Sequence, residues 1–298
     1  MNLDDVCSYT FYFLLNMVTI SLLLTLNNNF FKDYSPVYII SLFSFCSIAY
    51  VLLITTKNSP GILKNTNFST IINTSQTQSS SETEQSISLH NKMVSFPIQN
   101  CDKCNNISLP LRSHHCSRCG VCIRGYDHHC GMIGGCIGEE NHFKFIMFCL
   151  TQAIALILSI SGLLMTLSEL LNKNKEQYLN VPFAIYVLIF ILGCYCLFAS
   201  VLFGFHSYLT LTNQTTFEIF HREKCDYLVT FKEKKIKIMK ERGKELPPSF
   251  MFHPFDMGLI NNIKCLFKIT KWEDVYMENL KSNVIPFNCC ENQYWSCF

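Results

Sequence analysis

Long uncharged stretches alternate with polar segments along the chain. Uncharged runs cover residues 6–31, 34–56, 145–168 and 177–217, and the last of them has its most apolar part at 181–202. A helix needs about 20 apolar residues to cross the hydrocarbon core of a bilayer. Each run meets this length, and four such runs leave too few polar residues to coat a soluble protein. The pattern therefore predicts four membrane-spanning helices.

Two polar regions have a distinct composition. Residues 64–92 are rich in Ser, Thr, Asn and Gln and lack the apolar periodicity of a packed segment, which predicts a flexible insert. Residues 232–244 hold seven basic residues interleaved with Ile236, Ile238 and Met239. This second pattern fits a basic amphipathic helix on an anionic membrane surface and fits a solvated charged helix equally well.

The overall composition agrees with residence in a membrane. Hydrophobic residues make up 49% of the chain and charged residues 15%, whereas a soluble globular protein carries about 25% charged residues. The net charge of +2 gives no basic excess of the kind that binds nucleic acid, so we expect no nucleic-acid partner. Residues 1–5 contain no lysine or arginine, so a cleaved signal peptide is not expected.

The distribution of basic residues predicts the orientation in the membrane. Of the 24 lysines and arginines, only Lys32, Lys173 and Lys175 lie in the short loops between the first and second runs and between the third and fourth. The positive-inside rule then places the central segment and the C-terminal tail in the cytosol. An even number of spans puts both termini on the cytosolic side.

Seven of the 17 cysteines fall within residues 101–136, together with four histidines. Cys-x2-Cys pairs supply two thiolates from one tight turn, and zinc binds four such soft or borderline ligands as a tetrahedron. Two closed sites of three cysteines and one histidine would leave one thiol over. A RING domain needs a further pair of Cys-x2-Cys turns downstream, where the next cysteine is Cys149 inside the third run, so a RING ligase is disfavoured.

The same segment resembles the cysteine-rich domain of the DHHC protein S-acyltransferases, or palmitoyltransferases. The resemblance rests on Pro110 to Ser117, Asp127-His128-His129-Cys130, Cys136-Ile137-Gly138 and Asn141 with Phe145. Outside this segment, Ser59-Pro60-Gly61 is similar to the family's Asp-Pro-Gly motif, and Thr215-Thr216-Phe217-Glu218 matches its Thr-Thr-x-Glu motif. Phe255 to Gly258, with Asn262 and Phe267, is similar to its C-terminal motif. Together these motifs extend from Ser59 to Phe267, in the order in which they occur in the family.

The resemblance implies a role for each of these residues. It assigns one structural Zn²⁺ to Cys101, Cys104, His115 and Cys122, and a second to Cys116, Cys119, His129 and Cys136. Cys130 is then the remaining thiol and the nucleophile, because the thiolate is the reactive form and an imidazole can generate it. His128 would take the proton and Asp127 would orient His128. Thr215, Thr216, Glu218 and Asn262 are implied as supporting residues.

The implied activity is transfer of a long-chain acyl group, such as palmitoyl, from acyl-CoA through acyl-Cys130 to cysteines of cytosolic or membrane proteins. The sequence departs from the family after Cys130, where Gly131, Met132, Gly134 and Gly135 replace the usual Pro-Trp and two asparagines. The alternative function is therefore a zinc-stabilised membrane adaptor of the same fold. A channel or transporter has little support, because the spans hold no charged residue at mid-depth.

These observations predict an α-helical polytopic membrane protein with a small two-zinc domain between its second and third spans. The expected parts are the first two spans over 1–61, a flexible polar insert over 62–96, the cysteine-rich domain over 97–145, the last two spans over 146–211, and a cytosolic C-terminal region over 212–298. The family implies a location in an endomembrane, the Golgi or the endoplasmic reticulum.

Overall fold

The computed structural model describes residues 3–26, 34–63, 99–173, 183–241, 243, 253–267 and 276. The chain forms two compact units, each assembled from two separate stretches. Unit 1 consists of Met1–Pro60 and His129–Thr210, and unit 2 consists of Gly61–His128 and Leu211–Phe298.

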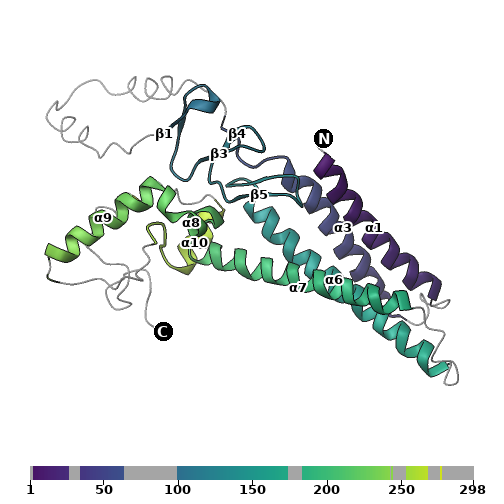
Figure 1. The fold of residues 1–298 in the computed structure, drawn as a ribbon. Helices are drawn as coiled ribbons and strands as arrows, with labels where there is room; N and C mark the ends of the chain where they lie inside the picture. The colour runs from purple at the N-terminus through teal and green to yellow at the C-terminus, as the bar shows by residue number, and fades with distance from the viewer. Residues whose placement is uncertain are drawn as a thin grey trace, which may run out of the picture. The chain divides into compact units, whose positions relative to one another are not determined.

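Unit 1 is built from long helices, drawn in Figure 1. They are α1 (Leu3–Leu26), α3 (Pro36–Lys57), α6 (His142–Lys173) and α7 (Phe183–Leu211), the last of which ends one residue into unit 2. In the described part of the chain, three segments are long and apolar enough to cross a membrane, namely Pro36–Lys57, His142–Asn172 and Ile185–Leu211. The apolar part of α1, Tyr12–Thr25, is shorter, so three of the four predicted spans are confirmed by length and composition.

Polar side chains of these helices form hydrogen bonds within unit 1, as an apolar environment requires. Ser35 caps α3 by accepting a hydrogen bond from the Tyr38 backbone N–H at 3.2 Å. The Tyr38 hydroxyl donates to the Leu158 carbonyl at 2.6 Å, and the Tyr34 hydroxyl donates to the Gly162 carbonyl at 2.9 Å. A side chain at Gly162 would collide with the Tyr38 hydroxyl, so glycine allows α3 and α6 to approach closely.

Two apolar clusters hold unit 1 together. One contains buried residues of α1, α3, α6 and α7, including Leu23, Leu42, Leu156 and Leu192. The other lies where the strand-rich segment meets the helices, and its buried members are Tyr12, Ala49, Leu53, Ile133, Ile137, Phe145, Phe148 and Cys149. Cys130 and Met132 pack against this second cluster.

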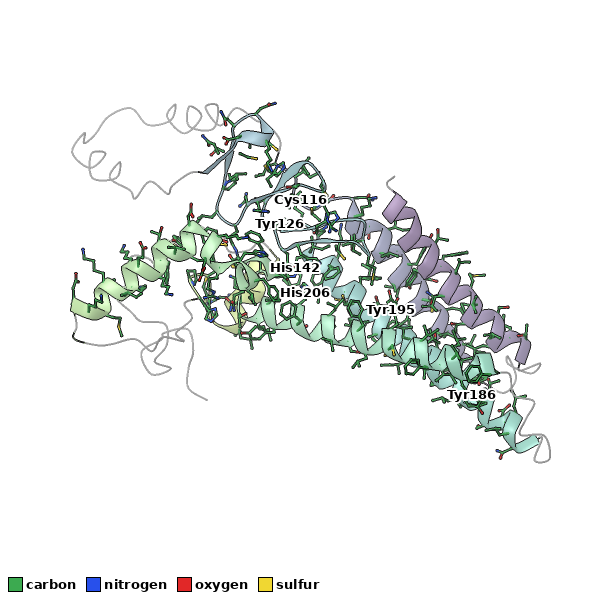
Figure 2. All side chains as sticks on the ribbon, viewed as in Figure 1. Cys116, Tyr126, His142, Tyr186, Tyr195 and His206 are labelled. Atoms are coloured by element: carbon green, nitrogen blue, oxygen red, sulfur yellow. The ribbon has the colours of Figure 1, made fainter. Side chains whose placement is uncertain are left out.

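Polar contacts fasten the segment after Cys130 to the helices of unit 1. Asn141 is fully buried, and its amide donates to the carbonyls of Thr56 at 2.7 Å and Cys136 at 2.9 Å. A pair of imidazoles joins α6 to α7, since His142 Nε2 and His206 Nδ1 are 3.1 Å apart (Figure 2). The sequence resemblance identified Asn141, whereas the histidine pair was not predicted.

Short two-stranded sheets form the cysteine-rich segment. β1 (Gln99–Cys101) pairs with β2 (Ile107–Leu109), β3 (His114–Cys116) pairs with β4 (Val121–Ile123), and β5 (His128–Cys130) pairs with β6 (Gly135–Ile137). The 3₁₀ turn η1 (Asp102–Cys104) lies between β1 and β2. The Ser59-Pro60-Gly61 motif leads into this segment, where the Gly61 carbonyl accepts from the Arg124 N–H at 2.9 Å.

The rest of unit 2 is made of short helices after α7. These are α8 (Thr216–Phe220), the 3₁₀ turn η3 (Arg222–Lys224), α9 (Asp226–Glu241) and α10 (Leu259–Leu266). Their core contains Cys225, Leu228, Phe231, Phe255 and Tyr276. The basic segment predicted as a helix is part of α9, up to Glu241, while the predicted polar insert falls largely outside the described residues.

Candidate functional site

The first predicted ligand set comes together in unit 2. Cys101 precedes η1 and Cys104 is its last residue, and His115 and Cys122 face each other across the β3–β4 pair. His115 Nδ1 lies 3.2 Å from the Cys104 sulfur and 3.7 Å from the Cys122 sulfur, and the four ligand atoms lie within 4.8 Å of one another. The local backbone supports this turn, because Asn105 and Asn106 adopt positive φ and the Asn106 N–H reaches back to the Cys101 carbonyl.

The spacing of these ligand atoms fits zinc. Zn–S bonds of about 2.3 Å and Zn–N bonds of about 2.0 Å in a tetrahedron place neighbouring ligand atoms roughly 3.5–3.8 Å apart. One imidazole nitrogen near two sulfurs cannot donate a proton to both, whereas a central metal ion satisfies all of them. Three thiolates and one imidazole leave no position for a water ligand, so a metal held here would be structural.

The residues of the second predicted ligand set belong to different units, and each half is described in its own unit. Cys116 and Cys119 form a Cys-x2-Cys turn in unit 2, closed by the Gly120 N–H donating to the Cys116 carbonyl at 2.8 Å. His129 and Cys136 lie in unit 1, with His129 Nδ1 3.7 Å from the Cys136 sulfur. The two sets are cysteine and histidine groups of the kind that could hold metal ions.

The carboxylate of Asp127 is held in a fixed orientation within unit 2. Thr216 donates its backbone N–H to Oδ1 and its hydroxyl to Oδ2, each at 2.7 Å. His128 Nδ1 lies 2.6 Å from Oδ2, so Nδ1 carries the proton that is donated to the carboxylate whenever the ring is neutral. The lone pair of that ring then lies on Nε2, the nitrogen that a general base would use. Asp127 is 2% exposed, so this orientation is protected from water.

Thr216 is positioned by a cap at the start of α8. The Thr215 hydroxyl accepts from the Glu218 N–H at 3.1 Å, and the Glu218 carboxylate accepts from the Thr215 N–H at 2.9 Å. This reciprocal capping box fixes the first turn of the helix. The Thr-Thr-x-Glu motif is therefore a helix start that presents the second threonine to Asp127.

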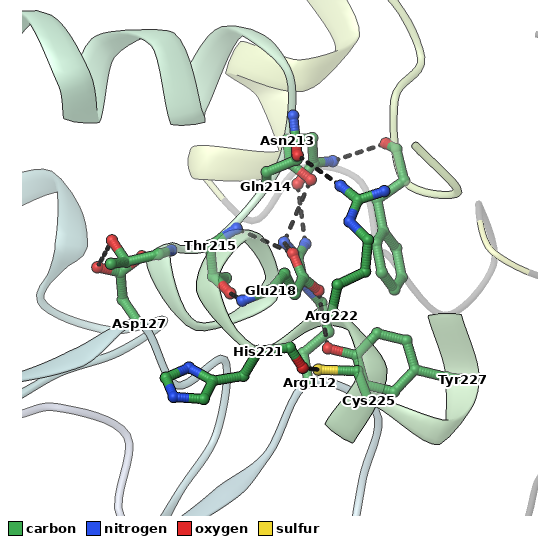
Figure 3. A network of polar contacts seen from close by, with 12 residues as sticks. Arg112, Asp127, Asn213, Gln214, Thr215, Glu218, His221, Arg222, Cys225 and Tyr227 are labelled. Atoms are coloured by element: carbon green, nitrogen blue, oxygen red, sulfur yellow. Dashed lines mark hydrogen bonds and ion pairs between the residues drawn. The ribbon is translucent and has the colours of Figure 1, made fainter. Parts of the chain in front are cut away.

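A buried ion pair connects this helix start to the cysteine-rich segment (Figure 3). The Arg112 guanidinium donates to both Glu218 oxygens, at 2.8 and 2.7 Å, and to Asn213 Oδ1 at 3.0 Å. The Arg112 and Glu218 side chains are 2% and 3% exposed. Arg112 also lies 4.2 Å from the centre of the Phe255 ring, and the Tyr227 hydroxyl donates to Glu218 at 2.9 Å. Every partner needed to bury this charge pair is thus present.

Burial keeps the neighbouring groups of this network protonated. It raises the pKa of Tyr227 well above its usual value and raises the pKa of the Cys225 thiol to about 11. At neutral pH the Tyr227 hydroxyl therefore remains a donor to Glu218, and Cys225 remains an unreactive buried thiol.

Asn262 also has a structural role in unit 2. Its amide donates to the Leu211 carbonyl at 2.6 Å and to Asp256 at 2.7 Å, and its Oδ1 accepts from the Met257 N–H at 2.9 Å. It is 1% exposed. Asn262 therefore joins the start of α10 to the end of α7.

Cys130 lies in unit 1 at the edge of the second apolar cluster and is half-buried. Met132, two residues later, accepts a hydrogen bond on its sulfur from the Tyr195 hydroxyl of α7 at 3.3 Å, and Tyr195 is labelled in Figure 2. Gly131 is exposed, and a Cβ added there would meet no atom within 4 Å. The residue after Cys130 is thus solvent-exposed with room for a side chain, and the following residue contacts α7.

Several residues that shape the site were not assigned from the sequence. Arg112 belongs to the quoted Pro110 to Ser117 stretch, yet its partner Glu218 lies 106 residues further along the chain. The contact of Tyr195 with Met132 spans 63 residues. A positive φ at Arg112 was also not foreseen. The local sequence does not indicate contacts between residues so far apart. An arginine and a glutamate that lie in two motifs of one family are nevertheless natural candidates for an ion pair.

Comparisons with known proteins agree on one family. A family model described as DHHC palmitoyltransferase matches residues 95–223. The chain is 33% identical over 209 residues to the putative ZDHHC-type palmitoyltransferase 7 of Dictyostelium discoideum, covering 66% of this chain and 42% of that protein. It is 30% identical over 195 residues to palmitoyltransferase ZDHHC12 of Homo sapiens, covering 64% of each.

A third relative, palmitoyltransferase ZDHHC3 of Homo sapiens, is 32% identical over 171 residues, or 54% of this chain and 52% of that protein. The chain thus spans between 42% and 64% of the length of these three relatives. The matched segment includes both ligand sets, Asp127 to Cys130, and the Thr-Thr-x-Glu motif. Residues 95–223 therefore match the model of the DHHC palmitoyltransferase domain, and the chain is similar over this segment to palmitoyltransferases of that family.

Proposed function

We propose that this protein is a protein S-acyltransferase that uses Cys130 as its nucleophile and a long-chain acyl-CoA, such as palmitoyl-CoA, as acyl donor. The observation that carries the proposal is the fixed Asp127 carboxylate, which accepts hydrogen bonds from Thr216 and His128. A carboxylate held in this way stabilises one tautomer of His128 and the imidazolium that follows proton uptake. Such an arrangement is suited to generating a thiolate from Cys130, two residues along the chain.

The reaction then proceeds in two thioester exchanges. His128 Nε2 takes the Cys130 proton, and the thiolate attacks the carbonyl carbon of acyl-CoA. The bond between that carbon and the CoA sulfur breaks, and CoA leaves with a proton returned by the imidazolium. In the second exchange an acceptor cysteine of a cytosolic or membrane protein, deprotonated by His128, attacks acyl-Cys130 and releases the thiol. Because thioester replaces thioester, positioning and thiolate formation limit the rate more than driving force does.

The surroundings of Cys130 suit a lipid substrate. Phe148, Cys149, Leu202 and Met132 belong to the apolar cluster that Cys130 joins. Transfer of a fatty chain from water to apolar surroundings is favourable by about 0.8 kcal/mol per CH₂ group. The helices of unit 1 and the lipids around them would therefore supply most of the affinity for the acyl chain.

Two Zn²⁺ ions are proposed to stabilise the cysteine-rich segment. Cys101, Cys104, His115 and Cys122 would hold one, and the second ligand set would hold the other. The ions contribute folding free energy and carry no reacting group, because each set is complete without water. Thr215, Glu218 and Asn262 support the site through the cap and the α10 anchor described above.

We further propose four spans, with both termini and the cysteine-rich segment in the cytosol. The support is the apolar pattern of the first run together with the small number of basic residues in the two short loops. An endomembrane, either the Golgi or the endoplasmic reticulum, is the proposed location.

A second function, a membrane adaptor without efficient transfer, is favoured by one feature. The glycines around Met132 replace residues that are rigid in the family, and Gly131 is exposed. A flexible loop at this point would place the nucleophile less reliably. The two functions differ in whether Cys130 becomes acylated.

Autoacylation separates these functions. Purified protein is incubated with an alkyne-tagged palmitoyl-CoA, and the label is tested for hydroxylamine sensitivity and mapped by peptide analysis. We expect a thioester label on Cys130 in the wild type and none in Cys130→Ser, with the zinc content unchanged. Cys194→Ser, at an exposed position on α7, is the matched control. Label of equal intensity in Cys130→Ser would refute the nucleophile assignment, and absence of label in the folded wild type would favour the adaptor.

A further inference from the structure

Helix α10 presents a continuous apolar face away from the protein. Leu259 is 44% exposed, Ile260 69% and Ile263 37%. These residues fall within about 100° on a helical wheel at 3.6 residues per turn, and Phe267, which follows the helix, lies on the same arc. A face of this kind on a helix of unit 2 requires an explanation, because large apolar side chains gathered together usually mark an interaction surface.

The other side of α10 packs against the protein through the buried residue Asn262. Asn262 is 1% exposed, and its amide donates to the carbonyl of Leu211 at 2.6 Å. Leu211 is the last residue of α7, whose segment Ile185–Leu211 is long and apolar enough to cross a membrane. The start of α10 is therefore fixed at the point where the chain leaves a spanning helix. A helix of this length that spans a bilayer ends in the headgroup region.

The polar residues of α10 have the arrangement expected of an interfacial helix. Lys264 lies next to the apolar face on the wheel and is exposed, so its ammonium can reach lipid phosphates while its methylene groups stay near the apolar side chains. Asn261 lies beyond it, on the side away from Ile263. An amphipathic helix with this pattern lies in the membrane plane, with its apolar face at the base of the headgroup layer.

Helix α9 provides a contrast within the same unit. Its apolar residues Leu228, Phe231 and Met239 are 7%, 0% and 6% exposed, so they are already covered by protein. Ile236 and Ile238 of α9 are partly exposed, and its Lys235 is buried. Of the two helices, α10 has the large apolar side chains that are exposed.

We propose that α10 is an interfacial helix that docks on the bilayer, with Leu259, Ile260 and Ile263 among the upper parts of the lipid acyl chains and Lys264 at the level of the phosphates. The occupant of the exposed face is lipid in this proposal, because Asn262 is hydrogen-bonded to Leu211, the last residue of a segment long and apolar enough to span a membrane. The inference depends on the spanning character of α7 and is independent of the acyltransferase proposal.

Tryptophan fluorescence in vesicles tests this placement. The full-length, zinc-loaded protein is given Trp272→Phe and Trp295→Phe, and Ile260→Trp supplies the only tryptophan. It is reconstituted in phosphatidylcholine vesicles with or without bromine atoms in the upper part of the acyl chains. We expect bromine to reduce the emission of Ile260→Trp by about twofold or more, since an interfacial helix buries its apolar face about 5–10 Å deep. Lys232→Trp on α9, an exposed position, is the matched control and should be quenched by aqueous iodide and little affected by brominated lipid.

A second measurement needs no substitution. Phosphatidylcholine carrying a photoactivated diazirine on its acyl chain is mixed into the vesicles with wild-type protein, and labelled peptides are identified by mass spectrometry. We expect label on 259–267 and little on 226–241. Equal emission of Ile260→Trp in brominated and plain vesicles, or a 259–267 peptide without label, would overturn the proposal. Quenching that appears only after an acceptor protein is added, or only at high protein-to-lipid ratio, would also overturn it, because the occupant would then be a protein.

Discussion

The hydroxyl of Thr216 is one of two groups by which this residue orients Asp127. Replacing it by valine keeps the shape and the backbone N–H but removes the 2.7 Å bond to Oδ2. A hydrogen bond to a charged group contributes about 1.5–3 kcal/mol, which corresponds to roughly ten- to hundredfold in rate if it is felt in the transition state. We therefore expect Thr216→Val to slow Cys130 acylation by about this factor.

The control for this change is Thr216→Ser, which retains the hydroxyl and should keep most of the rate. Initial rates at saturating acyl-CoA are the measurement, with the melting temperature recorded for each variant. If the role of Thr216 were purely structural, substitution would lower the melting temperature, and Thr216→Val and Thr216→Ser would acylate Cys130 at the same rate. Equal rates for Thr216→Val and wild type would remove Thr216 from the positioning of Asp127.

Tyr195 and Met132 form a contact that sets the position of the loop after Cys130. The phenol donates to the Met132 sulfur at 3.3 Å, and a single neutral hydrogen bond contributes about 1 kcal/mol. We expect Tyr195→Phe and Met132→Leu each to slow Cys130 acylation by about fivefold. The two changes combined should cost little more than either alone, because they remove the same contact.

Single-turnover labelling of the four variants completes this double-mutant cycle. Strict additivity of the two effects would mean that the residues act separately. The result bears on the missing Pro-Trp pair, since the contact shows how a thioether can hold this loop to α7 without an indole.

At the scale of elements, the β-hairpins of the cysteine-rich segment are too small to bury a core. β1 to β4 have three residues each, so the ligand set of Cys101, Cys104, His115 and Cys122 must supply much of their stability. A structural zinc contributes on the order of 10 kcal/mol to such a module. We expect Cys104→Ala to lower the bound zinc by about one ion per chain and to expose this segment to proteolysis.

Metal analysis of the purified variant, alongside limited proteolysis, checks this expectation. Cys194→Ala changes an exposed cysteine of α7 that belongs to neither ligand set, and it should retain the full metal content. If Cys104→Ala kept all of its zinc, the ligand assignment of the first set would be wrong.

The elements that could be predicted from sequence are those governed by local pattern. The three long helices follow from uncharged runs, and the ligand pairs follow from Cys-x2-Cys spacing, because both depend on residues close together in the chain. α6 begins at His142 and α7 continues to Leu211, beyond the predicted apolar stretches 145–168 and 181–202, and His142 and His206 form a partly buried polar contact in these added turns. Hydrophobicity alone does not detect such a contact.

The site could be predicted as a set of residues but not as an arrangement. The family resemblance supplied Asp127, Thr216 and Glu218, yet nothing in the sequence pairs Thr216 with Asp127 or Arg112 with Glu218. These pairings depend on how distant segments fold together. The same applies to the apolar face of α10, because only its exposure in the fold distinguishes it from the buried face of α9.

At the scale of the whole molecule, the Arg112–Glu218 pair joins the two stretches of chain that compose unit 2. Both side chains are almost fully buried, so removing the cation leaves an uncompensated carboxylate, at a cost of about 3–5 kcal/mol. We expect Arg112→Ala to lower the melting temperature of the zinc-loaded protein markedly. Arg118→Ala, at an exposed arginine of the same segment, should have little effect.

Thermal unfolding in detergent micelles provides the comparison. Adding Glu218→Gln to Arg112→Ala should recover part of the loss, because the buried charge is then gone, and Arg112→Lys should lie between the wild type and alanine. A melting temperature of Arg112→Ala equal to that of Arg118→Ala would show that the ion pair does not hold unit 2 together.

The same 106-residue separation has a consequence for how the protein is made. A ribosome adds about 5–20 residues per second, so Arg112 is synthesised roughly 5–20 seconds before Glu218. Two long helices, α6 and α7, emerge during that interval and must enter the bilayer first. The cysteine-rich segment is therefore complete in sequence, and able to collect metal, well before its buried arginine has a counter-ion. We expect the thiols of the nascent chain to be exposed at this stage, so the yield of mature protein should depend on the reducing power and zinc supply around the translating ribosome.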